Sequence, residues 1–218
     1  NTPYFTDENV EKEKGIIAQE LKMYDDEPTS VVYNNVLKCM YNKFPLNVDI
    51  GGTVESVYKI TKEELYSCYN TFYNPKNMFI CIAGNVDSDA VLKKIEGSIK
   101  TDEGIEIERI NEEEPEGVTT SYVEQKLEVA QPMFCLGFKE SVTTPERTIK
   151  ERVCTALLLA IIAGDSSPLY AELTRKGLIN DEFSSEYFCG NGYASVIFDG
   201  ESQNPSAVAK EIKNEIAR

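Results

Sequence analysis

Two glutamates near the start of the chain, Glu13 and Glu20, have the type and spacing that could serve a chemical site. They are two helical turns apart in a helix predicted from about Glu8 to Tyr24, and both fall on its apolar side. That side otherwise consists of Val10, Ile16, Ile17, Leu21, Met23 and Tyr24. A carboxylate on a buried stripe is costly unless it is paired, hydrogen-bonded or bound to a metal ion. Periodicity alone leaves open ion pairs with another helix, metal binding and acid–base chemistry.

The absence of histidine restricts that chemistry. Without His, these residues cannot form a Ser-His-Asp or Cys-His catalytic group. They also cannot form an ordinary catalytic zinc site, which needs three protein ligands and an open position. Any such reaction must therefore take groups from outside the 218 residues.

The excess of acidic over basic residues indicates which classes of molecule the chain could bind. The chain has 22 Lys and Arg residues against 37 Asp and Glu residues, a formal net charge of -15. Nucleic acid is disfavoured, because affinity for a phosphate backbone needs concentrated positive charge. The acidity suits basic peptides, or it simply keeps the chain soluble. No membrane contact is expected, since the longest apolar run, Val153 to Ala163, is far shorter than a spanning helix.

The six cysteines have no C-x-x-C spacing, and four of them lie in apolar segments. We interpret them as small buried thiols of a reducing compartment, and we expect a cytoplasmic location. No signal peptide opens the chain. Because the chain begins at Asn1 without an initiator Met, we expect that an upstream part has been cut away.

Capping residues and apolar runs predict two related α+β lobes, which suits a length of 218 residues. Helices are predicted at about 8–24, 29–42, 61–73, 87–98, 143–163, 167–176 and from 204 onward. Strands are predicted at 77–84, 119–129, 133–139, 183–189 and 193–199, the last two as a hairpin. The 77–84 strand should be buried on both faces, and the helix at 153–163 should be surrounded by protein, because both runs are almost entirely apolar.

The stretch between the lobes, residues 101–117, contains eight acids against one base, Arg109. Self-repulsion keeps such a stretch extended, which is typical of an interdomain linker. An acidic docking tail is the other interpretation.

Several blocks, in this order, resemble the insulinase/pitrilysin-type zinc peptidases. EKEKGIIAQE at 11–20, followed by DDEP at 25–28, is similar to the helix that carries the distal glutamate ligand of that family. The later blocks are GTVESV at 52–57, IT at 60–61, FYNPKNM at 72–78, GNVD at 84–87 and SSPLY at 166–170. The resemblance covers nearly the whole chain, weakly in the linker, and is strongest for bacterial processing-peptidase-like members.

The resemblance implies an α+β fold of mitochondrial-processing-peptidase-like (LuxS/MPP-like) lobes. Residues 1–100 would be the C-terminal part of the zinc-bearing peptidase domain, and 101–117 the acidic linker. Residues 118–218 would be the N-terminal part of a second, structurally related domain.

The resemblance also implies roles for the two acids. Glu20 would be a zinc ligand, and Glu13 would orient a ligating histidine. The family's H-x-x-E-H motif, which supplies two His ligands and the Glu that activates water, is absent and expected upstream. We therefore expect zinc in the full-length protein. The 218-residue fragment should hold no metal, contain no catalytic residue and be inactive.

The family's second domain supplies an Arg and a Tyr to the substrate carbonyl. Here Thr174 and Asn180 occupy the matching positions. Arg175, one position away, is either a substrate-side group or an exposed residue at a helix end. Members of the family divide the site between two chains. The resemblance thus implies a peptide substrate, and a homo-oligomer or a heterodimer with a paralogous subunit that provides the missing pair.

Two functions compete with a zinc endopeptidase. A non-catalytic scaffold subunit of the same fold is favoured by the missing Arg and Tyr, whereas Glu13 and Glu20 argue against it. Composition alone also allows an acidic peptide-binding or assembly module. The H-x-x-E-H motif expected upstream discriminates between the first two functions: an intact motif would favour the peptidase, and a degenerate motif would favour the scaffold.

Overall fold

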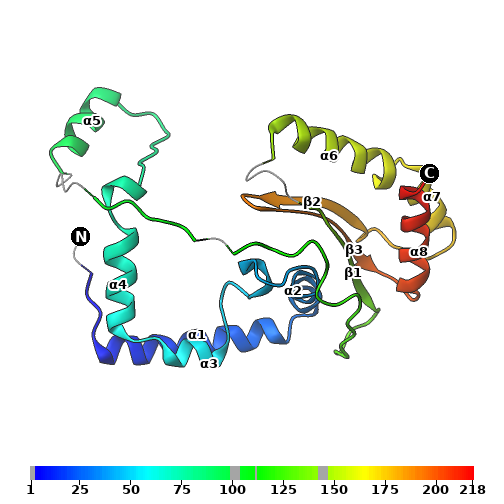
Figure 1. The fold of residues 1–218 in the computed structure, drawn as a ribbon, viewed down its shortest axis with the longest axis horizontal. Helices are drawn as coiled ribbons and strands as arrows, with labels where there is room; N and C mark the ends of the chain where they lie inside the picture. Colours follow the sequence, from blue (N-terminus) through cyan, green and yellow to red (C-terminus); the bar gives the residue numbers. More distant parts are fainter. Residues whose placement is uncertain (1–2, 99–103, 111, 142–146) are drawn as a thin grey trace. The chain divides into compact units, whose positions relative to one another are not determined.

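The computed structural model describes residues 3–98, 104–110, 112–141 and 147–218 as an α+β chain (Figure 1). It forms two compact units, which are described separately. The first unit is Asn1–Gln19 with Thr53–Asn111, and the second is Glu20–Gly52 with Glu112–Arg218. The elements, with η for a 3-10 helix, are α1 (Asp7–Asp25), α2 (Pro28–Met40), η1 (Pro45–Asn47), α3 (Val54–Lys59), α4 (Lys62–Phe72), η2 (Pro75–Asn77), α5 (Ser88–Glu96), β1 (Met133–Lys139), α6 (Ile149–Ala163), α7 (Pro168–Arg175), β2 (Ser184–Gly190), β3 (Tyr193–Glu201) and α8 (Pro205–Ile216).

Local capping chemistry sets the helices of the first unit. The predicted capping box of α4 is present: the Thr61 N–H donates to Glu64 Oε2 at 2.7 Å, and the Glu64 N–H donates to Thr61 Oγ1 at 3.2 Å. Asp87 caps α5 by accepting the Ala90 N–H at 3.0 Å. A further capping box opens α3, a helix that was not predicted from the sequence.

The prediction of a buried strand at 77–84 is wrong for this chain. Residues 78–83 have no regular secondary structure, and their side chains are exposed. A strand forms only when a neighbour pairs with its N–H and C=O groups. No segment in the described part of the chain makes such hydrogen bonds to these residues.

A three-stranded antiparallel sheet, in the order β1-β3-β2, organises the second unit. The central strand β3 is buried on both faces: Val196 and Phe198 contact one core cluster, and Ile197 belongs to the other. The helices α6, α7 and α8 contribute to the first cluster, and α2 packs on the opposite face (Figure 1). The predicted hairpin is confirmed as β2 and β3, with Gly192 at a φ of 83° in the turn.

The helix α2 approaches the sheet most closely at Gly137 of β1. A Cβ atom there would clash with Met40 Sδ and lie 3.0 Å from Val36 Cγ2, so a larger residue would force these side chains to move. Tyr41, directly after α2, is buried on the same face, where its OH lies 2.5 Å from Ser195 Oγ. Thus α2 covers this sheet although it precedes the acidic stretch in the sequence.

The second half of the acidic stretch is anchored to this unit through Glu114. Its carboxylate accepts the backbone N–H groups of Asn42, Lys43 and Phe44 at 2.7–2.9 Å. Its Oε1 also lies 2.6 Å from Lys139 Nζ of β1. Burial raises the pKa of Glu114, but the hydrogen bonds from Lys139 and the three N–H groups outweigh this effect and hold the pKa at about 2. Glu114 is therefore a fixed anion in the second unit.

The helix α6 is less covered than predicted. Leu159 and Ala163 are buried against the sheet. On its other side, four large apolar residues are 51–70% exposed: Val153, Leu157, Leu158 and Ile161. The prediction of a helix surrounded by protein is wrong for the described residues, because only one side of α6 has a packing partner.

By length and composition alone, Ile149–Arg175 would suit a membrane-spanning helix. The structure divides this stretch into α6 and α7, and each is shorter than the roughly 20 residues that a spanning helix needs. The absence of membrane contact stays a prediction.

One other prediction differs from the structure, and one falls outside the described residues. Residues 119–129 were predicted to form a strand, which is wrong: they have no regular secondary structure, and the Thr119 N–H donates to Cys39 O instead. The predicted helix start at Thr143 with Glu146 lies outside the described residues. As described, α6 begins at Ile149, after a capping box of Thr148 and Glu151.

The cysteines are more exposed than predicted. All six are free, and Cys39, Cys135 and Cys189 are partly buried. The exposed ones are Cys68, Cys81 and Cys154. Cys81 lies in the unpaired segment 78–83, and Cys154 lies on α6, of which only one side is covered.

Candidate functional site

The helix α1 carries both Glu13 and Glu20. Thr6 caps its first turn by accepting the Asn9 N–H at 3.2 Å, and the helix continues without a break to Asp25. Both glutamates are exposed. Seven residues at 1.5 Å each place them about 10 Å apart along the helix axis, too far for both to bind one metal ion. Glu20 Oε1 accepts a hydrogen bond from the Tyr24 OH at 3.3 Å.

The buried face of α1 is not the predicted one. The structure buries Val10, Lys14 and Ala18, of which only Val10 was predicted to lie on the apolar arc. Ile16 and Ile17 of that arc are 48% and 39% exposed. The described residues supply packing partners for the other side of the helix and, on the arc, for Val10, but they leave Ile16, Ile17 and both glutamates exposed. Most of the apolar arc, with its two glutamates, therefore faces solvent.

These acids do not complete a zinc site by themselves. The part of the chain that the structure describes contains no group of three or more His, Cys, Asp or Glu side chains that could hold a metal ion. Because a catalytic zinc ion needs three protein ligands, Glu20 can supply at most one of them.

The substrate-side candidate, Arg175, is engaged with its neighbour Glu172. Its Nε and Nη2 donate to the two carboxylate oxygens of Glu172 at 2.9 and 2.7 Å, within α7. The hydrogen bond from Arg175 holds the pKa of Glu172 at about 2. Asn180 is occupied as well, since its Nδ2 donates to Glu201 Oε2 at 2.8 Å. A contact of Arg175 with substrate stays a prediction.

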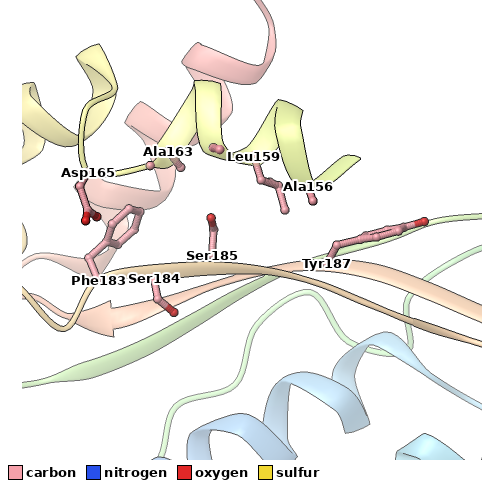
Figure 2. A pocket seen from close by; sticks show the side chains of 10 residues that line it. Ala156, Leu159, Ala163, Asp165, Phe183, Ser184, Ser185 and Tyr187 are labelled. Carbon is pink, nitrogen blue, oxygen red and sulfur yellow. The ribbon is translucent and has the colours of Figure 1, made fainter. Parts of the chain in front are cut away.

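A cavity that was not predicted from the sequence lies between α6 and β2 (Figure 2). Its volume is about 340 Å³, and Leu159, Phe183, Ser185 and Tyr187 are among its lining residues. Figure 2 shows Ser185 pointing toward α6. Among the described residues, no hydrogen bond joins Ser185 Oγ to a base that would activate it.

Comparison with known proteins relates the chain to one family. A sequence model described as the Peptidase M16 inactive domain matches residues 59–218. The uncharacterised zinc protease YmfH of Bacillus subtilis is 37% identical over 221 residues, which cover 99% of this chain and 52% of that protein. The crystal structure of an M16-like peptidase from Alicyclobacillus acidocaldarius matches with a TM-score of 0.92 at 37% identity, covering 100% of this chain and 52% of that chain.

A more distant structure shares the fold alone. A chain of complex III2 from Candida albicans matches with a TM-score of 0.62 at 15% identity, covering 88% of this chain and 46% of that one. The chain spans about half the length of the relatives that it matches. The predicted α+β class and the resemblance to insulinase/pitrilysin-type peptidases are confirmed. Since the family model covers most of the chain, the protein belongs to the M16 peptidase family.

Proposed function

We propose that these residues are an internal part of a cytoplasmic M16 zinc endopeptidase that hydrolyses peptides or unfolded polypeptides. Residues 1–100 are then the C-terminal part of the zinc-bearing domain, 101–117 connect the domains, and 118–218 begin the second domain. The names of relatives such as YmfH support the zinc chemistry, and their length supports the incomplete domains.

The observation that carries the proposal is the placement of Glu13 and Glu20 on the exposed apolar arc of α1. Any polypeptide that covers Ile16 and Ile17 also desolvates these carboxylates, which is costly unless they are paired or bound to metal. Glu20 is the proposed zinc ligand, and Glu13 the residue that orients a ligating histidine. The two histidines and the catalytic glutamate come from an H-x-x-E-H segment outside the 218 residues, so the fragment alone is inactive.

The test is the zinc content of the full-length natural protein, measured by elemental analysis for three forms. The wild type and a Glu8→Gln control should each hold about one zinc ion per chain, because Glu8 lies on another side of α1. Glu20→Gln should lose it. The 218-residue chain should bind none, and stoichiometric zinc in it would contradict the proposal.

A non-catalytic scaffold subunit is the second candidate. It is favoured by Thr174 and Asn180 at the positions of the family's Arg and Tyr, and Asn180 is held by Glu201. Absence of zinc from the full-length wild type would favour this candidate over the endopeptidase.

The missing Arg and Tyr also suggest a partner. We propose that a second copy or a paralogous subunit supplies them. A chain of similar fold forms part of complex III2 of Candida albicans, which supports assembly as a use of this fold. Peptide cleavage at a normal rate by a strictly monomeric full-length protein would contradict this division of the site.

A further inference from the structure

Glu20 and Tyr24 lie one turn apart near the end of α1, on the same side of the helix. The Tyr24 OH donates a hydrogen bond to Glu20 Oε1 at 3.3 Å. Among the described residues, no hydrogen bond or ion pair reaches Glu20 Oε2. One oxygen of the carboxylate is therefore held by a neighbour on the same helix, while the other is open to a ligand.

The backbone that carries this pair is fixed at the end of the helix. The Glu27 N–H donates to the Tyr24 carbonyl oxygen at 3.2 Å, in the turn that follows α1. Leu21 packs against Gly51, where an added Cβ atom would lie 2.6 Å from Leu21 Cδ2. Both contacts lie within the second unit. The position of the Tyr24 side chain is therefore set by local structure.

Tyr24 belongs to the apolar arc of α1 and is 43% exposed. A polypeptide that covers this arc removes water from the phenol group as well as from Glu20. A buried tyrosine OH needs a hydrogen-bond partner, and Glu20 Oε1 already accepts its hydrogen bond. Hydrogen bonds in open active sites are often long, and they shorten when the site is complete.

A phenol is chemically suited to support a carboxylate that binds a metal ion. A tyrosine OH is neutral at pH 7, so it holds the carboxylate in one orientation without neutralising its charge. A Lys or Arg side chain in the same place would compete with the metal ion for that charge. Carboxylates that bind metal ions are commonly hydrogen-bonded by neighbouring groups, which orient them.

We propose that Tyr24 is a positioning residue, which holds Glu20 Oε1 so that Oε2 is free to bind the zinc ion of the full-length protein. Tyr24 acts through Glu20 and does not itself bind the metal. This inference deepens the proposed function and rests on its assignment of Glu20 as a zinc ligand.

The test is the zinc dissociation constant of the full-length natural protein, measured by competition with a chelator of known affinity. Tyr24→Phe keeps the aromatic ring and removes only the OH. It should weaken zinc binding by about 10-fold or more, as is usual when a group that orients a metal ligand is lost. An affinity within about twofold of the wild type would overturn the inference.

Tyr58→Phe is the matched control for the removal of a tyrosine OH. Tyr58 lies on α3 and is 53% exposed. Its replacement should change the zinc dissociation constant by no more than about twofold, as expected for a surface substitution. Equal weakening of zinc binding by the two variants would count against a specific role of Tyr24.

The stability of the metal-free protein separates positioning from a structural role. Without zinc, water can take the place of the phenol at Glu20, so Tyr24→Phe should lower the Tm of the zinc-free full-length protein by no more than about 3 °C. A larger drop in the zinc-free protein would assign Tyr24 to the stability of α1 and overturn the inference.

Glu20→Gln, measured alongside, distinguishes this inference from the proposed function. Zinc that is lost in Glu20→Gln but bound normally by Tyr24→Phe would leave the endopeptidase standing and remove the role of Tyr24. Absence of zinc from the wild type would overturn both proposals.

Discussion

Lys139 Nζ lies 2.6 Å from Glu114 Oε1, and only 4% and 11% of the two side chains is exposed. The same ammonium group donates to the carbonyl oxygens of Pro115 and Gly117 at 2.5 and 3.0 Å, so all three of its donors are used. It also lies 5.3 Å from the centre of the Tyr41 ring, a cation–π distance. This pair joins the acidic stretch to β1, and the three N–H groups bound by Glu114 join it to the end of α2.

Replacing Glu114 with alanine should destabilise the 218-residue chain by about 3 kcal/mol, because Lys139 and three N–H groups lose their shared partner. The free energy of unfolding is measured by urea titration with circular dichroism, since the chain has no tryptophan. Glu113→Ala is the matched control: Glu113 is the exposed preceding residue, and its loss should cost no more than about 0.5 kcal/mol. Equal losses in both variants would show that Glu114 has no special role.

The contribution of Glu114 should also depend on pH. Its pKa is about 2 in the folded chain, below the ordinary glutamate value of 4.5. A carboxyl group whose pKa is lower in the folded state than in the unfolded state stabilises the folded chain fully at pH values above its unfolded-state pKa. This stabilisation is lost as the pH falls through the folded-state pKa. The difference in unfolding free energy between wild type and Glu114→Ala should therefore be constant above about pH 5 and shrink between about pH 4.5 and 2. A difference that does not change down to pH 2.5 would contradict the assigned pKa.

The helices were predictable because their signals are local. The Thr61–Glu64 capping box and the Asp87 cap need only residues three positions apart, and the structure contains both. Glu114 was not predictable in this way. It is one of eight acids in a stretch without periodicity, and only the fold decides which of them meets Lys139.

Predictions that depend on a distant partner failed in a consistent way. The strand at 77–84, the covered side of α6 and the apolar arc of α1 all need neighbours that the described residues do not supply. An apolar pattern indicates that a segment is suited to burial. It does not indicate whether the residues that would cover the segment are among those described. The cavity beside Ser185 was missed because it depends on the packing of α6 over β2.

Thiol reactivity should follow the positions of the cysteines. Burial, then the nearby charges of Asp199 and Glu186, raises the pKa of Cys135 to about 12. At pH 8 its thiolate fraction is then about 10⁻⁴, so iodoacetamide should not modify it before unfolding. Cys68, Cys81 and Cys154 should react in the native 218-residue chain. Mass spectrometry of labelled peptides reads out each site, and early labelling of Cys135 would contradict its packing between α2 and the sheet.

Arg175→Ala in the full-length protein should change kcat/KM for a peptide substrate by no more than about twofold relative to the wild type. The reason is that the guanidinium group is already paired with Glu172, and such an exposed ion pair contributes little energy. Glu172→Ala is the matched variant, since it releases Arg175 without removing it. A loss of about 100-fold in Arg175→Ala, with normal activity in Glu172→Ala, would instead establish Arg175 as the substrate-side group.

Two leucines of the second unit compare its covered and uncovered surfaces. Leu173 of α7 is fully buried in the first core cluster, and its replacement by alanine should cost about 2–5 kcal/mol of unfolding free energy. Leu157 of α6 is 59% exposed, so the same replacement should cost no more than about 0.5 kcal/mol in the 218-residue chain. Both positions are helical, and the change in helix propensity is therefore the same. If Leu157→Ala lowers the free energy of urea unfolding as much as Leu173→Ala does, the outer side of α6 is already covered in solution. A urea midpoint that rises with protein concentration would then identify a second copy of the chain as the covering partner.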